Sequence, residues 1–89
     1  GKGKISGHIL DTEGEPVDEA KIRLKRGKKK LKTILSDMNG NGFFEFGGLE
    51  AGQYKIFVTK KSYKRTTETV LLEEGEEEEI EIHMKKSKK

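Results

Sequence analysis

Residues 42–58 read GFFEFGGLEAGQYKIFV, and this stretch decides the fold class. Phe44 and Phe46 lie two positions apart in its first half. In its second half, apolar residues recur at every second position from Tyr54 to Val58. A period of two is typical of a β-strand with one buried face, and the glycines between the two halves favour a turn. The stretch therefore predicts two strands joined by a tight connection.

The same alternation runs through the rest of the chain. Strands are predicted over residues 4–11, 20–26, 31–36, 43–46, 54–60, 66–72 and 79–84. The residues expected to point inward outside the opening stretch are Ile5, Gly7, Ile9, Ala20, Ile22, Leu24, Ile80, Ile82 and Met84. The third strand is ambiguous in register because Ile34 and Leu35 are adjacent. A long basic helix over residues 18–35 is the rival interpretation, and strict alternation from Ala20 to Lys25 argues against it.

Seven short, regularly spaced strands predict an all-β fold, a seven-stranded antiparallel sandwich with Greek-key connections. The chain has 89 residues, which suits a single domain. Apolar residues make up 30% and charged residues 39%, and their alternation is typical of sheets with one solvated face. The sequence contains no run of eighteen apolar residues, so it predicts no membrane-spanning helix. The absence of cysteine excludes a disulfide framework, a thiol nucleophile and a cysteine-ligated metal.

Over residues 4–84 the sequence resembles the carboxypeptidase regulatory-like domain, a transthyretin-like (prealbumin-like) sandwich close to the B-type repeats of collagen-binding adhesins. The resemblance rests on ISGHILDTEGEPVDEAKIRL, on the pair SD, and on GFFEFGGLEAGQYKIFV. The residues expected to hold its core and turns are Gly7, Gly42, Phe44, Phe46, Leu49, Gly52, Tyr54 and Ile82. Ser62–Tyr63 stands where the family usually has Gly-Tyr, a mild departure. Residues 1–3 are interpreted as a linker remnant and residues 85–89 as a basic disordered tail.

The resemblance implies a non-catalytic accessory module of a larger secreted, periplasmic or cell-surface protein, in which it contributes spacing, solubility or a docking surface. The partners it implies are neighbouring domains of that protein and, through a docking surface, carbohydrate or another surface protein. No cofactor is expected. The residues agree with this interpretation, because no serine–histidine–acid or cysteine–histidine spacing stands out.

Asp37, Asn39 and Asn41 alternate before Gly42, which is how a helix–loop–helix calcium site begins. Position 12 of such a loop would be Gly48, which has no carboxylate, and strands are predicted on both sides. We interpret the segment as a turn, since Asn and Gly tolerate positive φ. A calcium-stabilised repeat of the adhesin type is kept as an alternative.

Two further kinds of site are disfavoured. An isopeptide bond of the kind found in adhesin repeats needs a buried lysine on the first strand, and Lys4 has no amide-forming partner on the last strand. His8 and His83 are predicted on outward faces of neighbouring strands, where Glu81 could complete a zinc site. Exposed histidines on a sheet are usually only solvated, so we predict no metal there.

Residues 21–32, KIRLKRGKKKLK, hold eight basic residues and no acid. The candidate anion-binding patch comprises Lys21, Arg23, Lys25, Arg26, Lys28, Lys29 and Lys30. An anionic polymer is the functional interpretation. Nucleic acid is not favoured, because the stretch contains no aromatic residue for stacking on bases. The structural interpretation is preferred: lysines keep a sheet edge soluble and unpaired, and the acidic block at residues 73–79 offsets their charge.

Phe43 and Phe57 are predicted to face outward, and together on one sheet they could form a carbohydrate or protein contact. The alternative is that one of them covers the open edge of the sandwich, and the sequence does not decide between the two.

Overall fold

The structure is a computed structural model that describes residues 2–36 and 42–87 of the chain. Within these residues the backbone forms seven strands and no helix, so no described helix could cross a membrane. The strands are β1 (Gly3–Asp11), β2 (Lys21–Arg26), β3 (Lys29–Leu35), β4 (Phe43–Leu49), β5 (Gly52–Thr59), β6 (Thr66–Leu72) and β7 (Glu77–Met84).

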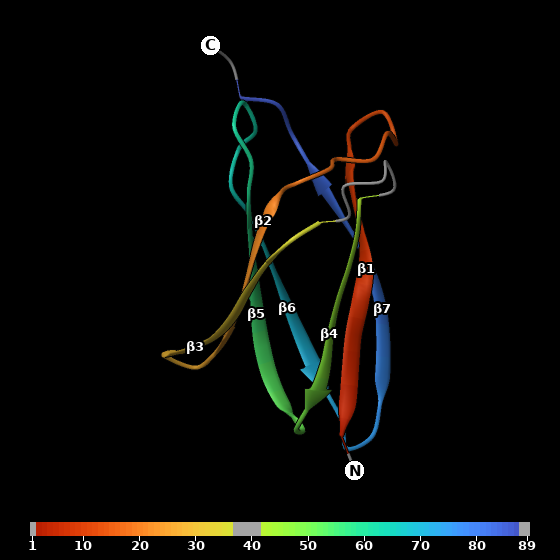
Figure 1. Ribbon diagram of the computed structural model, residues 1–89, viewed down its shortest axis with the longest axis vertical. Coiled ribbons are helices and arrows are strands. Elements are labelled where there is room, and N and C mark those ends of the chain that lie inside the picture. The colour runs from red at the N-terminus through yellow and green to blue at the C-terminus, as the bar shows by residue number, and fades with distance from the viewer. Residues whose placement is uncertain (1, 37–41, 88–89) are drawn as a thin grey trace.

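The strands form two sheets that pack against each other (Figure 1). One sheet has the order β4-β1-β7 and the other the order β3-β2-β5-β6. The predicted seven-stranded, all-β sandwich is therefore confirmed. The Greek-key description of its connections stays a prediction.

One strand pair departs from the expected antiparallel arrangement, because β1 and β7 are parallel. A turn after β6, closed by the N–H of Glu76 donating to the carbonyl of Glu73 (3.0 Å), carries the chain into the other sheet. The carbonyl of Glu76 then accepts from the N–H of Lys4 (2.9 Å), so β7 starts where β1 starts. Both strands consequently run in the same direction. Alternation of side chains is the same in parallel and antiparallel strands, so the pattern did not distinguish them.

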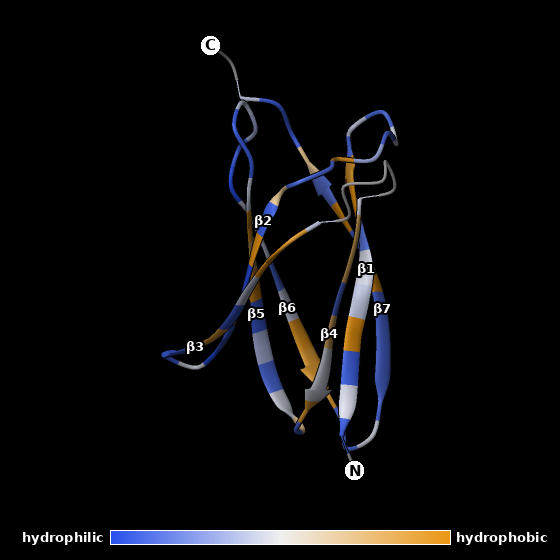
Figure 2. Ribbon diagram, in the orientation of Figure 1, coloured by the Kyte–Doolittle hydropathy of each residue, from blue (hydrophilic) through white to orange (hydrophobic). Residues whose placement is uncertain are grey.

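The core lies between the sheets and contains the side chains that the alternation placed inward. Figure 2 shows apolar residues separated by polar ones along β1. Among the residues expected to hold the fold, Gly7, Gly42, Phe44, Phe46, Tyr54 and Ile82 are buried, and Leu49 and Gly52 are half-buried. Ile5, Ile9, Ala20, Ile22, Leu24, Ile56, Val58 and Met84 are also buried, as predicted, and Ile80 is half-buried.

Strand β3 contributes least to the core. Its only partly buried residue is Ile34, whereas Leu35 is 54% exposed. This resolves the ambiguous register of the third strand, with Ile34 inward and Leu35 outward. In Figure 1 the β2–β3 hairpin extends away from the remaining strands.

Buried polar contacts tie the 11–20 connection to the sandwich. The hydroxyl of Ser36 accepts from the N–H of Ala20 and donates to the carbonyl of Val17, both at 2.9 Å. Gly42 has a φ of 64° and its N–H donates to Asp18 Oδ1 (3.0 Å). A Cβ at Gly42 would lie 2.5 Å from a backbone oxygen, so this turn requires glycine.

The end of the described chain is also held by backbone hydrogen bonds. The carbonyl of Lys85 accepts from the N–H of Lys64 (2.8 Å), and the N–H of Ser87 donates to Ser62 (2.9 Å). Residues 85–87, the first part of the expected tail, are thus paired with the β5–β6 connection rather than free.

Candidate functional site

The basic residues predicted as an anion-binding patch all lie on the β2–β3 hairpin, but the structure separates them into two groups. Lys21, Arg23 and Lys25 lie on the outer face of the four-stranded sheet, because Ile22 and Leu24 between them point into the core. Arg26, Lys28, Lys29 and Lys30 lie at the projecting end of the hairpin and are exposed. The first group forms a surface of a rigid sheet, whereas the second forms an exposed tip.

An aromatic ring completes the first group. Phe57 of β5 lies directly opposite Arg23 of β2 in the sheet register. The Nζ of Lys25 lies 5.1 Å from the centroid of the Phe57 ring, within the range of a cation–π contact. We call Arg23, Lys25 and Phe57 the basic platform. The basic stretch at residues 21–32 itself contains no aromatic residue, and Phe57 lies beside it only through the pairing of β2 with β5.

Arg23 carries the most unusual polar atom of the platform. Its side chain is half-buried, and its Nε is covered yet has no hydrogen-bond partner among the described residues. A covered guanidinium nitrogen without a partner is costly, because Arg stays charged and all its nitrogens are donors. The platform therefore contains a cationic side chain with one covered, unpaired nitrogen beside an aromatic ring.

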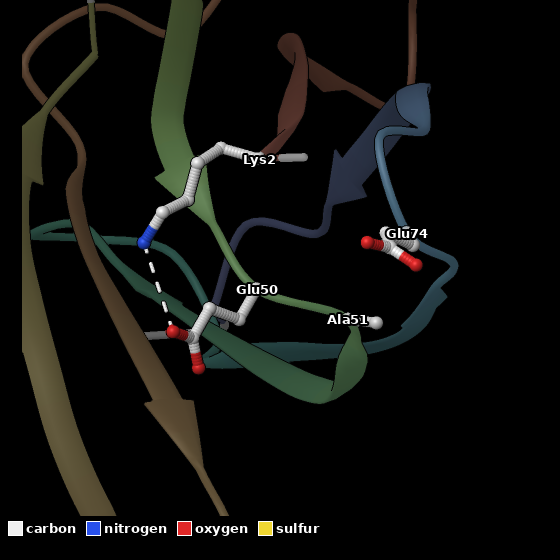
Figure 3. A pocket seen from close by; sticks show the side chains of 4 residues that line it. All are labelled: Lys2, Glu50, Ala51 and Glu74. Carbon is white, nitrogen blue, oxygen red and sulfur yellow. Dashed lines mark ion pairs between the residues drawn. The ribbon is translucent and has the colours of Figure 1, made fainter.

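Arg26 is partly neutralised at the other end of β2. Its Nη1 lies 3.6 Å from Glu50 Oε1, and Lys2 Nζ lies 3.6 Å from Glu50 Oε2. Lys2, Glu50, Ala51 and Glu74 line a shallow pocket there (Figure 3). The side chains of Lys2 and Glu50 are more than 60% exposed, so water screens their charges.

Acidic residues occupy the opposite side of the molecule. Strand β7 carries Glu77, Glu78, Glu79 and Glu81, and it forms an edge of the three-stranded sheet. Strand β3 forms an edge of the other sheet, and these two strands lie on opposite sides of the sandwich in Figure 1. The sandwich therefore separates the glutamates of β7 from the basic edge of β3, and compensation of the hairpin charge by the whole block at residues 73–79 stays a prediction.

Two carboxyl groups with shifted pKa values belong to exposed turns and edges. Backbone N–H groups of Glu15 and Glu13 donate to Asp11 Oδ1 (2.9 and 2.8 Å), and these hydrogen bonds lower the pKa of Asp11. A side-chain hydrogen bond with Glu76, together with the charge of Glu76, raises the pKa of Glu78. The first shift reflects a turn and the second reflects crowding of like charges.

The two histidines do not form a metal site. His8 lies beside Glu81 in the β1–β7 register, whereas His83 lies beside Leu10. His83 Nε2 is 3.9 Å from Glu81 Oε1. No group of three His, Cys, Asp or Glu side chains could hold a metal ion within residues 2–36 and 42–87.

The remaining candidates are placed as follows. Asp37, Asn39 and Asn41, the calcium candidates, lie outside the described residues. Lys4 is part of the outer surface, where its Nζ lies 3.3 Å from Glu45 Oε2, so it is not the buried lysine that an isopeptide bond requires. 

The two outward phenylalanines belong to different sheets, so they do not form one contact surface. Phe43 lies on β4 and meets His8 edge-to-face, with ring centroids 5.4 Å apart. Phe57 lies on β5, in the other sheet.

Comparison with known proteins agrees with the sandwich. Residues 4–85 match the family described as the carboxypeptidase regulatory-like domain. The chain belongs to this family. No curated protein matches the chain. As a member of the family, the chain has the fold that the resemblance implied, and the transthyretin-like expectation is confirmed.

Several solved structures share the fold at low sequence identity. BcpA, the major pilin subunit of Bacillus cereus, gives a TM-score of 0.79 at 19% identity over 94% of this chain and 29% of that chain. GBS52, the minor pilin of Streptococcus agalactiae, gives 0.75 at 16% identity over 99% of this chain and 46% of that chain. The 3-chlorocatechol 1,2-dioxygenase of Rhodococcus opacus gives 0.70 at 9% identity over 98% and 60%.

These similarities establish the fold alone, because pilins and a dioxygenase share it. The chain spans less than two thirds of each of these three proteins. It therefore corresponds in length to a part of each.

Proposed function

We propose that this carboxypeptidase regulatory-like domain is a non-catalytic accessory part of a larger secreted, periplasmic or cell-surface protein, in which it acts as a spacer. Family membership and the similarity to parts of pilin subunits support the proposal. Its partners in this role are the neighbouring domains of the same protein, with carbohydrate or another surface protein as further candidates.

The elongated shape of the domain supports the proposed spacer role. The chain measures 42 × 26 × 17 Å along its principal axes. The start of β1 and the segment that follows β7 lie toward opposite ends of the longest axis (Figure 1). When neighbouring domains are joined to opposite ends of a domain, its full length separates them.

A fusion of two copies through a short rigid linker tests this role by small-angle X-ray scattering. The expected result is a particle about twice as long as one copy, because ends at opposite poles keep tandem domains extended. A fusion that is no longer than a single copy would overturn the spacer role.

Labelling of intact cells of the source organism tests the location. An antibody raised against residues 2–87 is expected to stain intact or outer-membrane-permeabilised cells, while an antibody against a cytoplasmic protein is not. Staining only after full lysis would contradict an extracytoplasmic location.

Binding of an anionic polymer is a second candidate function, favoured by the basic platform. Its cations lie beside the half-buried ring of Phe57, and the Nε of Arg23 lacks a partner in the described part of the chain. Sulfate or phosphate groups are the ligands that such a guanidinium binds best. Titration with heparin and with duplex DNA at two salt concentrations tests this function, because contacts with phosphate or sulfate weaken steeply with salt.

The matched variants for that titration are Arg23→Gln with Lys25→Gln, and Lys61→Gln with Lys64→Gln as the control. Both double variants remove two positive charges, but only the first alters the basic platform. The platform variant is expected to lose most of the affinity and the control to retain it. Equal losses would show that net charge alone is responsible.

A further inference from the structure

Strand β3 is an edge whose outer side is open and basic. It pairs with β2 on one side and has no strand on its other side among the described residues. Lys29, Lys30 and Lys32 are exposed, and none of them makes an ion pair within residues 2–36 and 42–87. Its seven residues include no acid. The free N–H and C=O groups of such an edge can pair with another strand.

Strand β7 is the opposite kind of edge. It pairs with β1, and no described strand pairs with its other side. Its eight residues carry four glutamates and no lysine or arginine. Glu77, Glu79 and Glu81 are exposed. A side-chain hydrogen bond with Glu76, followed by the charge of Glu76, raises the pKa of Glu78, so carboxyl groups lie close together here.

The signs of these charges decide which edges can meet. Two β3 edges would bring lysines against lysines, and two β7 edges would bring glutamates against glutamates, so neither strand pairs with its own kind. A β3 edge and a β7 edge attract each other and have similar lengths, seven and eight residues. They lie on opposite sides of one sandwich, so they can meet only between two molecules (Figure 1).

We propose that the lysine edge of β3 in one copy binds the glutamate edge of β7 in a second copy, forming a continuous sheet across both. The contact uses different surfaces of the two copies, so each bound copy still offers one free edge. Such a heterologous contact grows into an open row unless it closes into a ring. The domain would then act as a lateral connector between neighbouring molecules, beyond its role as a spacer.

Sedimentation velocity of the isolated chain over a range of concentrations tests the proposal. Association is expected at about 0.02 M salt, where the Debye length is roughly 20 Å, and loss of association at about 0.5 M, where it is roughly 4 Å. A chain that stays monomeric at millimolar concentration in low salt would overturn the proposal. Association that does not respond to salt would also overturn it, because the contact would not be electrostatic.

Charge-reversed variants identify the surfaces. The first variant carries Lys29→Glu, Lys30→Glu and Lys32→Glu, so that both edges are acidic. The second carries Glu77→Lys, Glu79→Lys and Glu81→Lys, so that both edges are basic. Each variant alone is expected to associate about tenfold more weakly than the original chain, or not at all. An equimolar mixture is expected to associate again, because the acidic edges of one variant meet the basic edges of the other.

A control variant distinguishes an effect of the two edges from an effect of net charge on association. Lys61→Glu, Lys64→Glu and Arg65→Glu change the charge as much as the first variant, but these exposed residues lie outside both edges. This control is expected to associate like the original chain. Equal loss in the control, or a mixture that stays monomeric although both variants show the original dichroism spectrum, would overturn the proposal. Should a reversed variant fail to fold, Lys→Gln and Glu→Gln at the same positions give the same test of each edge.

Discussion

Replacement of Gly7 by alanine tests a close backbone approach between β1 and β7. Gly7 lies on β1 opposite Ile80 of the parallel strand β7. A Cβ added at Gly7 would lie 1.9 Å from the carbonyl oxygen of Ile80 and 2.9 Å from its carbonyl carbon. Real Cβ atoms essentially never come closer than 3.0 Å to another heavy atom, so the two strands must move apart by more than 1 Å.

The expected cost is set by two opposing effects. Overpacking a core costs typically about 1–3 kcal/mol, and the upper end applies because the obstructing atoms belong to the backbone and cannot rotate away. Alanine restricts the unfolded chain and returns about 0.4–1 kcal/mol. A net loss of about 2 kcal/mol lowers the melting temperature of a domain of this size by roughly 8–16 °C.

Thermal melting followed by circular dichroism measures this loss, and Gly47→Ala is the matched control. Gly47 lies on β4, and an added Cβ would meet nothing within 4 Å. The control is expected to melt at the original temperature or slightly above it, through the effect on the unfolded chain alone. If Gly7→Ala melted at or above the original temperature, the close parallel pairing of β1 with β7 would be wrong.

The remaining predictions concern the core, a buried hydroxyl and a crowded carboxylate. Phe46→Ala should cost about 3–5 kcal/mol in urea denaturation, because it leaves a cavity where Phe46 is 1% exposed; an unchanged midpoint would contradict the core assignment. Ser36→Ala should cost about 1–3 kcal/mol, because the buried N–H of Ala20 loses its acceptor. Thermal melting of this variant and of the original chain measures the loss, and equal melting temperatures would refute the role of Ser36. Glu78→Gln should raise the melting temperature at pH 7. The raised pKa of Glu78 means that folding favours its protonated form, so its charged form is disfavoured near Glu76 at neutral pH. The gain should disappear in acid, where Glu78 is protonated, and a gain that persists there would contradict the electrostatic cause.

The inward-facing residues were predictable because burial on one face of a strand leaves a direct mark in the sequence. Phe44, Phe46, Tyr54 and Ile82 are all buried where alternation placed them. Each of these predictions depends on the local period alone.

The partners of each strand were not predictable in the same way. The parallel pairing of β1 with β7 produces the same alternation as an antiparallel pair. Phe57 lies beside Arg23 and Lys25 only because β5 follows β2 in the sheet, although more than thirty residues separate them in the chain. Phe43 and Phe57 look alike in the sequence and yet lie on different sheets.

For the charged candidate sites too, the residues could be predicted from the sequence, but their positions relative to one another could not. The sequence identified every basic residue of the hairpin, but the register shift between Leu24 and Lys25 helps decide which lysines share a face. Separation of the acidic and basic blocks to opposite edges depends on the order of all seven strands. This order is a property of the whole fold rather than of either block.

Amide hydrogen exchange measured by NMR tests the central claim, two packed sheets with open edges at β3 and β7, most directly. Slow exchange is expected for the hydrogen-bonded amides of β1, β2 and β5, which have a paired strand on both sides. Fast exchange is expected for the amides of β3 and β7 that point away from their single neighbour. Uniformly fast exchange, or protection that extends evenly across β3 and β7 in the monomer at high salt, would contradict this architecture.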